Sequence, residues 1–534
     1  MKSIKLFVIT LLLLTPVYGW SSPPQVKPVK NVIILIPDGM SVGATTLARW
    51  FQGGQPLALD EMAAGLVRTY NSDTPIGDSA PAGSAFATGY KSQTGQIASL
   101  PVKVGMPGVP LPAAGQENRP LATVLEAARL AGKSTGLVAT SEIMHATPAD
   151  FSAHSPSRKA YDDLSEQQVH NRLDVVFGGG AKFLEAKGRK DGEDMFKALK
   201  EQGYEIIKTP AELELQKKPK VWGLFAPADL AYELDRNPAN QPSLADMTAR
   251  AIALLSKNPN GFFLMVEGSK IDWAAHANDP VGIISDVLAF DRAVKVALDF
   301  AKLDGATVVI STSDHGNSGI SMGDRATSGN YDKVPLASFI APLKRAKGTA
   351  EKLAAMLNRE RSNVREVVAS QWGINDLNDA ELAGIVNCKE KTAYAFGPVM
   401  AKRAHIGFTT NGHTGEDVVW YAWSPRRDHL TGVLENTDVA LLMAHYLGVD
   451  LHKTTDTLFV EAETGFTAKG AATGTDRKDP QNPVLTAKKG GTDIRLPRNR
   501  NYALVNGRRV ELPGVTVFNG KKWYTSQAAV DLLK

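Results

Sequence analysis

Carboxylates and imidazoles stand at several positions in this chain with the spacing that metal binding requires. Asp272 and His276 lie four residues apart in IDWAAHAND, so on a helix both side chains project from one face and can hold one ion. Asp314 and His315 are adjacent in STSDHG, where a strand gives way to a turn and both side chains can reach one ion. His413 lies in a glycine-flanked loop, NGHTGED. Taken singly, each pattern is also common among ordinary surface and loop residues.

Oxygen ligands complete this set. Asp38 in IPDGM and Glu267 in VEGSKID each follow an apolar run. Imidazole mixed with carboxylate suits zinc, whereas a site of carboxylate and hydroxyl oxygens suits magnesium. Asp38, Thr147 and Glu267 are candidates for such an oxygen-only site, and Asp38 is able to bridge it to a zinc ion.

A nucleophile and an anion clamp are also indicated. Ser79 follows Asp78 in GDSAPAGSAFATG and opens a run of small, helix-compatible residues. A serine at a helix N-terminus lies beside free backbone N–H groups, which favour a phosphate, although a plain helix cap is the commoner role. No GxSxG motif surrounds Ser79, so a metal ion is the expected activator. Arg158 in HSPSRKAY is a candidate to hold two phosphate oxygens.

The elements that must position these residues alternate between short apolar runs and longer amphipathic stretches. Three runs are expected to be buried strands, at 31–36, 262–266 and 307–311, and three stretches are expected to be helices, at 121–131, 243–256 and 281–301. This alternation predicts an α/β fold with a mostly parallel central sheet and helices on both faces. All three strands end in acidic residues, and ligands of such sheets bind beyond the carboxyl ends of the strands. One shared site is therefore expected there.

The N-terminus and the cysteine content bear on the compartment. Lys2 and Lys5 precede an apolar run, and Val17 and Gly19 suit a cleavage site, so residues 1–19 are expected to be a signal peptide. A retained anchor is the alternative. We expect export to the periplasm, the cell surface or the medium. Cys388 is the single cysteine, which excludes an internal disulfide bond and a multi-cysteine zinc site.

Composition divides the rest of the chain. We expect a catalytic domain at 30–464, with an inserted lid at 343–405, where charged residues and helix formers concentrate. Residues 465–491 are rich in Gly, Ala, Thr, Lys, Asp and Pro, which is typical of a linker. Residues 492–534 contain two Asn-Gly pairs between strand-like runs, which predicts a small β-hairpin-rich module that ends in a short helix.

The charge is unevenly distributed. Residues 469–534 hold thirteen Lys and Arg against five Asp and Glu, whereas the whole chain has a net charge of +4, so the body is acidic on balance. No basic stripe runs through the body, which argues against nucleic acid as a specific partner. The basic C-terminal module is expected to attach to an anionic cell-envelope surface, unless its charge merely offsets that of the body.

Several long motifs occur together in the order seen in the alkaline phosphatase family, which the chain resembles over about residues 31–460. They are IPDGM, DSAPAGSAFATG, HATPADFSAH followed by SRK, GLFA, PSLADMT, FFLMVEGSKIDWAAHAND, SDHG and GHTG. The resemblance implies an exported alkaline phosphatase that hydrolyses phosphate monoesters through a phosphoserine. Much more faintly, the C-terminal module resembles the copper amine oxidase N-terminal-like repeats of bacterial surface proteins.

The resemblance also implies a role for each residue, on a site with two zinc ions and one magnesium ion. The first zinc would be held by Asp272, His276 and His413. The second zinc would be held by Asp38, Asp314 and His315, with the nucleophile Ser79 as a further ligand. Magnesium would be held by Asp38, Thr147 and Glu267. Arg158 would clamp phosphate, and Asp78 would orient it.

Two positions depart from the best-studied bacterial members of the family. His145 stands where those members have Asp, and Trp273 stands where they have Lys. Both residues are expected to lie behind the metal ligands, so the departures put in doubt how tightly magnesium and phosphate bind, but not the reaction.

Other functions remain open. A phosphodiesterase or a sulfatase on the same metal scaffold is the nearest alternative. A sulfatase would need a modifiable Cys or Ser in a CxPxR-like motif, which neither Cys388 nor Ser79 has, and diesterase relatives usually have a Thr nucleophile. A surface-attached scavenger of phosphate or metal would explain the basic module but not Ser79 and Arg158. The natural ester and the oligomeric state stay open, with a homodimer as one expectation.

Overall fold

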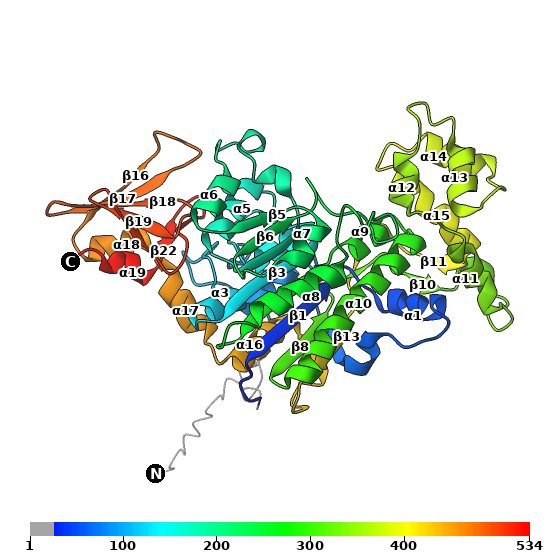
Figure 1. Ribbon diagram of the computed structural model, residues 1–534, viewed down its shortest axis with the longest axis horizontal. Helices are drawn as coiled ribbons and strands as arrows, with labels where there is room; N and C mark the ends of the chain where they lie inside the picture. Colours follow the sequence, from blue (N-terminus) through cyan, green and yellow to red (C-terminus); the bar gives the residue numbers. More distant parts are fainter. Residues whose placement is uncertain (1–25) are drawn as a thin grey trace, which may run out of the picture.

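A ten-stranded sheet forms the centre of the molecule (Figure 1). The computed structural model describes residues 26–534, so the expected signal peptide at 1–19 lies outside the described residues. The strands lie side by side in the order β14-β2-β13-β8-β1-β7-β3-β4-β6-β5. In chain order they are β1 (Asn31–Pro37), β2 (Ala63–Arg68), β3 (Ser134–Glu142), β4 (Val175–Gly179), β5 (Glu205–Ile207), β6 (Val221–Leu224), β7 (Phe262–Gly268), β8 (Thr307–Thr312), β13 (Val418–Trp423) and β14 (Gly432–Glu435).

Most of this sheet is parallel. Every pairing from β8 through β1, β7, β3, β4 and β6 to β5 is parallel, whereas β13 runs antiparallel to both β8 and β2. The three strands expected from the sequence are β1, β7 and β8, and they are neighbours in the middle of the sheet. The expected fold class is therefore confirmed.

Helices cover both faces of the sheet and form two cores with it. The side chains of β1 alternate between them: Ile33 and Leu35 pack on one face, and Val32 and Ile34 on the other. The first face is covered by α1 (Val42–Phe51), α8 (Leu244–Leu255) and α10 (Pro280–Asp304), and the second by α2 (Ser79–Thr88), α3 (Val124–Leu130) and α16 (Asn436–Leu447). Because β1 is buried on both faces, its sequence is a continuous apolar run and not an alternating one.

Local sequence determines where the covering helices begin and end. The Ser243 side chain accepts the backbone N–H of Asp246, and the Asp246 carboxylate accepts that of Ser243, which caps α8. At α10 the Asp279 side chain accepts the N–H of Val281 alone, and the helix ends at Gly305 in a left-handed conformation with φ +65°. These caps explain why the predicted helix ranges agree with the structure to within a few residues.

The stretch expected to be a lid is helical. It consists of α11 (Leu336–Lys344), α12 (Ala350–Ala355), α13 (Val364–Trp372), α14 (Asp379–Val386) and α15 (Ala393–Arg403). These helices stand at one end of the molecule, away from the C-terminal strands (Figure 1). The buried Trp372 packs edge-on against Phe396, with ring centroids 6.0 Å apart, and donates from its indole N–H to Gly348. The segment is therefore an ordered unit with its own packing.

The stretch expected to be a linker, 465–491, instead contains regular structure. The C-terminal region after α17 (Leu451–Leu458) comprises β15 (Val460–Glu461), α18 (Ala462–Ala468), β16 (Ala472–Asp476), β17 (Val484–Lys489), β18 (Thr492–Pro497), β19 (Tyr502–Val505), β20 (Arg508–Glu511), β21 (Val517–Phe518), β22 (Trp523–Thr525) and α19 (Gln527–Asp531). Strands β16 to β20 form one antiparallel sheet, so this sheet begins at Ala472. The composition wrongly predicted a linker here, because only alternate residues of β17, Leu485 and Ala487, face the core.

The two predicted hairpins are present in this C-terminal module, which we define as residues 460–534. Asn506 and Gly507 connect β19 to β20, and Asn519 and Gly520 begin the turn between β21 and β22. Both asparagine-glycine pairs place glycine at positive φ, +79° for Gly507 and +92° for Gly520. The expected terminal helix is α19.

The C-terminal module packs tightly against the catalytic domain. Val515, Val517 and Tyr524 join Ala122 and Phe459 in one buried apolar cluster. Polar contacts add to it around Arg500, whose Nε lies 2.7 Å from Glu166 and whose guanidinium also pairs with Glu193. Among the described residues, no helix combines the length and the apolar character needed to span a bilayer.

Candidate active site

The carboxyl ends of the three central strands bring acidic residues together. Asp38 directly follows β1, Glu267 lies near the end of β7, and Asp314 follows β8. The parallel register pairs Ile36 with Glu267 and Leu35 with Ser311, which sets the three carboxylates at one edge of the sheet. All three are fully buried. Such a cluster is costly without a cation, because each negative charge is removed from water and repels the others.

One group of ligand atoms is formed by Asp272, His276 and His413. Asp272 and His276 lie on α9 (Lys270–His276), the helix that follows β7, and the His276 Nε2 atom is 3.3 Å from the Asp272 carboxylate. His413, on the short strand β12 (His413–Thr414), brings its Nε2 to 3.2 Å from that of His276 and 3.6 Å from Asp272. The predicted i and i+4 pair is thus on one helical face.

The tautomers of the imidazoles favour a metal ion. The Nδ1–H of His276 donates to the carbonyl of Asn411 at 2.6 Å, and that of His413 donates to the carbonyl of Gly77 at 2.8 Å. In the neutral tautomer that makes this bond, each Nε2 carries a lone pair and no hydrogen, and the 3.2 Å approach of the two Nε2 atoms is then not a hydrogen bond. Two lone pairs at this distance suit a shared cation, and the carbonyls orient the rings as partners of metal-bound histidines usually do.

A second group contains Asp38, Asp314 and His315. The His315 Nε2 atom is 3.4 Å from each of the two carboxylates, and its Nδ1–H donates to Gly316. Neither oxygen of Asp38 has a hydrogen-bond partner, and Oδ2 of Asp314 has none either. Burial and the neighbouring carboxylates, Asp314 foremost, raise the pKa of Asp38 well above its usual range. Buried orphan oxygens of this kind fit metal coordination.

A third group lies on the other side of Asp38. Asp38, Glu267 and His145 offer ligand atoms that lie within 4.8 Å of one another. Oε1 of Glu267 and Oγ1 of the buried Thr147 are also without hydrogen-bond partners. Burial and the charge of Asp314 raise the pKa of Glu267 to about 8. Asp38 and Glu267, two of the three expected ligands, therefore lie together, and His145, expected behind the ligands, lies beside them; Thr147 as the third ligand stays a prediction.

Ser79 is the first residue of α2 and faces the second group. Its Oγ lies 3.3 Å from the Nε2 of His315. All ten residues of α2 are buried, and the residue before them, Asp78, has an extended backbone that starts the helix. The partial positive charge and the free N–H groups of the helix N-terminus therefore lie at the Ser79 hydroxyl.

Arg158 contacts Asp78, the residue that directly precedes Ser79, and therefore lies near the Ser79 hydroxyl. The Arg158 Nη1 atom donates to Asp78 at 2.8 Å, and Nη2 faces Nε2 of His145 at 3.2 Å. Burial opposes ionisation of Asp78, but the charge of Arg158 holds the pKa of Asp78 below its usual value. For His145, burial and then the charge of Arg158 lower the pKa to about 3, so its ring is neutral. A neutral ring is the form that can coordinate a metal.

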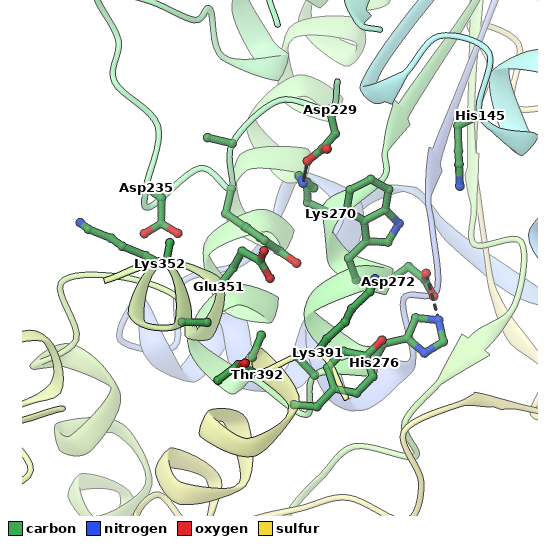
Figure 2. A pocket seen from close by; sticks show the side chains of 18 of the residues that line it. His145, Asp229, Asp235, Lys270, Asp272, His276, Glu351, Lys352, Lys391 and Thr392 are labelled. Carbon is green, nitrogen blue, oxygen red and sulfur yellow. Dashed lines mark hydrogen bonds and ion pairs between the residues drawn. The ribbon is translucent and has the colours of Figure 1, made fainter. Parts of the chain in front are cut away.

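A cavity of about 1210 Å³ opens above these groups. Ser79, Arg158, Trp273 and His276 line one side, and residues of the lid helices line the other. Figure 2 shows Glu351 of α12 and Lys391 before α15 on the side of the cavity that faces Asp272 and His276, whereas Lys352 lies beside Asp235 and points away from them. The cavity is far larger than a phosphate group, so it has room for the organic part of a substrate.

Sequence reasoning missed several residues in and beneath this cavity. Asn317, which follows the DHG motif, donates to the Asp272 carboxylate at 2.6 Å and fixes its orientation. Lys270, the first residue of α9 and two residues before Asp272, pairs with Asp229 and lies 4.0 Å from the ring of Trp273 (Figure 2). The place of Asn317 directly after the DHG motif was the signal in the sequence that could have identified it. For Asp229 no signal existed, because only the fold brings it near α9.

Comparison with known proteins identifies relatives over most of the catalytic domain. The profile of the alkaline phosphatase family matches residues 29–449. Alkaline phosphatase 3 of Bacillus subtilis is 37% identical over 439 residues, which cover 77% of this chain and 87% of that protein. The repressible alkaline phosphatase of Saccharomyces cerevisiae is 32% identical over 492 residues, which cover 80% and 83%. The C-terminal module lies beyond the matched family region.

Solved structures agree with this relationship. The alkaline phosphatase of Thermus thermophilus superimposes with a TM-score of 0.72 at 28% identity, and covers 80% of this chain and 93% of its own. A mutant of the alkaline phosphatase from the Antarctic bacterium TAB5, solved with Mg bound in its M3 site, superimposes with a TM-score of 0.58 at 25% identity and covers 80% and 100%.

Proposed function

Since the chain belongs to the alkaline phosphatase family, we propose that it hydrolyses phosphate monoesters through a phosphoserine at Ser79, on a site with two zinc ions and one magnesium ion. The observation that carries this proposal is the position of Ser79. Its hydroxyl stands at a buried helix N-terminus, 3.3 Å from His315 and beside the Asp78–Arg158 pair. No other described arrangement in the chain combines a nucleophile, an anion clamp and three groups of metal ligands.

The residues present fit the three ions. Asp272, His276 and His413 would hold one zinc, and Asp38, Asp314 and His315 the other. Asp38, Thr147 and Glu267 would hold magnesium, with His145 near enough to contribute. Each set includes side-chain atoms that are buried without a partner or lone pairs that face one another. When bound, such ions supply charge stabilisation for attacking and leaving oxygens and lower the pKa of a coordinated hydroxyl or water.

The chain's own groups account for the remaining steps. Oγ of Ser79 loses its proton and forms a bond to phosphorus while the bond between phosphorus and the ester oxygen breaks, and the alcohol leaves with a proton. Arg158 binds two of the phosphoryl oxygens, and the N–H groups at the start of α2 face the same anion. Water then cleaves the phosphoserine and restores the hydroxyl. Asp78 holds the guanidinium in place through the 2.8 Å contact.

Substrate comparison and intermediate trapping test this function. The purified protein, supplied with Zn²⁺ and Mg²⁺, should turn over p-nitrophenyl phosphate much faster than bis-p-nitrophenyl phosphate or p-nitrophenyl sulfate. An acid quench during turnover should leave phosphate covalently bound to the peptide that contains Ser79. A preference for the diester or the sulfate would overturn the proposal. A preference for the monoester with no phosphate bound to the peptide would show that the reaction does not pass through a phosphoserine.

We also propose that the C-terminal module contacts an anionic cell-envelope surface. Its basic residues divide into two sets. Arg498, Arg500 and Lys522 pair with acidic residues and are held in place by the fold, whereas Lys478, Arg508 and Lys521 are exposed and their side chains have no partner in the described chain. The second set supports electrostatic attachment. Export by a signal peptide and a homodimeric assembly stay predictions.

A further inference from the structure

A second cavity, of about 640 Å³, adjoins the active site on the far side of Arg158. It shares Arg158 and His145 with the larger cavity above the metal ligands. Its other walls come from the start of α5 (Tyr161–His170), from the segment around Lys190, and from Gln481 and Arg498 of the C-terminal module. A group bound here would therefore lie close to a phosphate held by Arg158.

The acidic residues of this cavity are largely occupied by other partners. Asp191 forms a buried pair with Arg189, whose Nε atom lies 2.9 Å from its carboxylate. Asp163 pairs with Arg498 at 2.8 Å and accepts from Asn499 at 3.0 Å. Their charges are therefore balanced within the fold. Asp162 remains, and its carboxylate accepts the backbone N–H of Lys190 at 3.0 Å.

The basic residues of the cavity are freer. Lys159 and Lys190 are both exposed, and within the described residues neither ammonium group has a hydrogen bond or an ion pair. Together with Arg158 they line the space with positive charge. An anion placed between them would form charge-assisted hydrogen bonds, which are the stronger kind, with groups that need not give up a partner.

The cavity also has an apolar wall and a fixed shape. Tyr161 and Phe183 meet edge to face with ring centroids 4.9 Å apart. Arg498 also lines the cavity and is held in place by Asp163 and by the carbonyl of Gln481 at 2.7 Å. Because Gln481 and Arg498 lie beyond the region matched by the family, this cavity is completed by an addition to the family's domain.

We propose that this cavity is a subsite for a second phosphate group, so that the enzyme favours monoesters whose organic part carries another phosphate. The proposal rests on the proposed function, because it needs the first phosphate at Ser79 and Arg158. Lys159 and Lys190 would bind the second phosphate, and Tyr161 and Phe183 would contact the carbon skeleton between the two. The C-terminal module then contributes to substrate choice as well as to the fold.

A pair of matched substrates tests the subsite. For the enzyme supplied with Zn²⁺ and Mg²⁺, kcat/KM is measured for fructose 1,6-bisphosphate and for fructose 6-phosphate. We expect Lys190→Gln to raise the KM for the bisphosphate about 3- to 10-fold, the range expected from the loss of one charge-assisted contact, so that the ratio of the two kcat/KM values falls by a similar factor. Lys190→Arg should largely keep the ratio.

Lys187→Gln is the matched control. Lys187 lies three residues before Lys190, its side chain is 84% exposed and pairs with Glu185, and it does not line the cavity. Both Gln variants remove one positive charge. If both lowered the ratio of the two kcat/KM values equally, the effect would come from the long-range electrostatic field and not from a contact in the cavity, which would overturn the subsite. If the unaltered enzyme hydrolyses neither of these substrates nor p-nitrophenyl phosphate, the proposed function fails instead. Calorimetric binding of the bisphosphate to wild type and Lys190→Gln then still decides whether the subsite exists.

Discussion

Two serines on the same buried helix have different surroundings. Ser79 Oγ faces His315, whereas Ser84 Oγ accepts the N–H of Ala98 at 2.8 Å and donates to Asp150 at 2.7 Å. We expect Ser79→Ala to lose at least about 100-fold in kcat with an unchanged melting temperature, leaving only direct attack by water activated at the metals. Steady-state rates with p-nitrophenyl phosphate and thermal melting measure both effects.

Ser84→Ala should show the opposite pattern. It leaves the buried Asp150 without its hydroxyl partner, which costs about 1–3 kcal/mol of unfolding free energy, while kcat stays within a few-fold. If both serine variants lost activity to the same extent, Ser79 would not be the nucleophile and the loss would reflect damage to α2.

Gly39, between Asp38 and the first turn of α1, has no room for a side chain. Its φ is +64°, and a Cβ atom there would lie 2.5 Å from Oδ1 of Asp272. We expect Gly39→Ala to displace that ligand and to lower both kcat/KM and zinc content by at least about 10-fold, beyond the roughly 1–2 kcal/mol cost of the left-handed backbone. Elemental analysis and steady-state rates test this.

The control is Gly53→Ala. Gly53 has φ +82° but nothing within 4 Å of the added Cβ. This variant should be less stable by a similar backbone cost and should keep full activity and metal content. Loss of metal in both variants would mean that backbone strain, and not the contact with Asp272, is responsible.

At the residue scale, the sequence predicted the clustered candidate ligands and missed the residues that surround them. Asp272, His276 and His413 are recognisable because a metal site needs a few residue types, and helix periodicity fixes the spacing of the first two. Lys391 and Thr392 reach the same cavity from the lid (Figure 2). A lysine followed by a threonine is common before an exposed helix, so nothing in the local sequence distinguishes these two residues from surface residues.

At the scale of elements, the junction between the catalytic domain and the C-terminal module contains a buried histidine. His170 Nε2 accepts from Nη1 of Arg500 at 2.7 Å, which requires a neutral ring. Arg172 and Arg509 are nearby as well, and Tyr502 is the neighbouring ring at 6.4 Å. Burial and then Arg500 lower the pKa of His170 to about 3.

This histidine should make the fold sensitive to acid. Its pKa in the folded state lies below its unfolded value of about 6.5, so between these values the unfolded chain binds the extra proton and stability falls as the pH falls. We expect the unfolding free energy of wild type to fall, relative to His170→Gln, by up to about 1.4 kcal/mol per pH unit below pH 6.5. Glutamine keeps an acceptor for Arg500, and both proteins share the Glu166–Arg500 pair.

Denaturant titrations of both proteins at pH 7, 6 and 5 make the comparison. The difference in unfolding free energy between the two should be constant above pH 7 and should change steadily below pH 6.5. Parallel curves over the whole range would show that His170 is able to take up a proton in the folded state.

Element boundaries illustrate where prediction from sequence stops. Strands β1, β7 and β8 were predictable because strands buried on both faces are continuously apolar. Strands β16 and β17 were not, because their sheet has one open face and strand β16 contains only Ala, Thr, Gly and Asp. The stability of β16 comes from its pairing with β17 across five residue pairs, which composition does not reveal.

At the scale of the whole molecule, the proposed metal ligands connect distant parts of the chain. They come from the ends of β1, β7 and β8, from α9 and from β12. Chelation should therefore both inactivate and destabilise the enzyme, because it leaves buried carboxylates in mutual repulsion. We expect excess EDTA to lower the melting temperature by several degrees, and Zn²⁺ with Mg²⁺ to restore both properties. An unchanged melting temperature after verified metal loss would contradict this.

Envelope attachment is also a property of the whole molecule. The full-length protein should sediment with vesicles that contain phosphatidylserine at low salt and be released at physiological salt, because the Debye length then falls to about 8 Å. Replacing Lys478, Lys489, Arg508 and Lys521 by Gln should abolish sedimentation without loss of phosphatase activity, since none of them lines the catalytic cavity. Failure of the unaltered protein to sediment would show that the charge of the module only offsets that of the body, and equal sedimentation of both proteins would show that these four residues do not carry the attachment.

The position of β1 in the sheet has a consequence for biosynthesis. Strand β1 is the first to leave the ribosome, yet its two neighbours are β7, which begins at Phe262, and β8, which begins at Thr307. At about 5–20 residues per second, translation of the chain up to β7 takes roughly 10 to 45 s after β1 has appeared. During that time NVIILIP has no partner of its own and is apolar enough to pair with another nascent chain. The yield of active enzyme should therefore depend on translation rate and on chaperone supply more than on the stability of the finished fold.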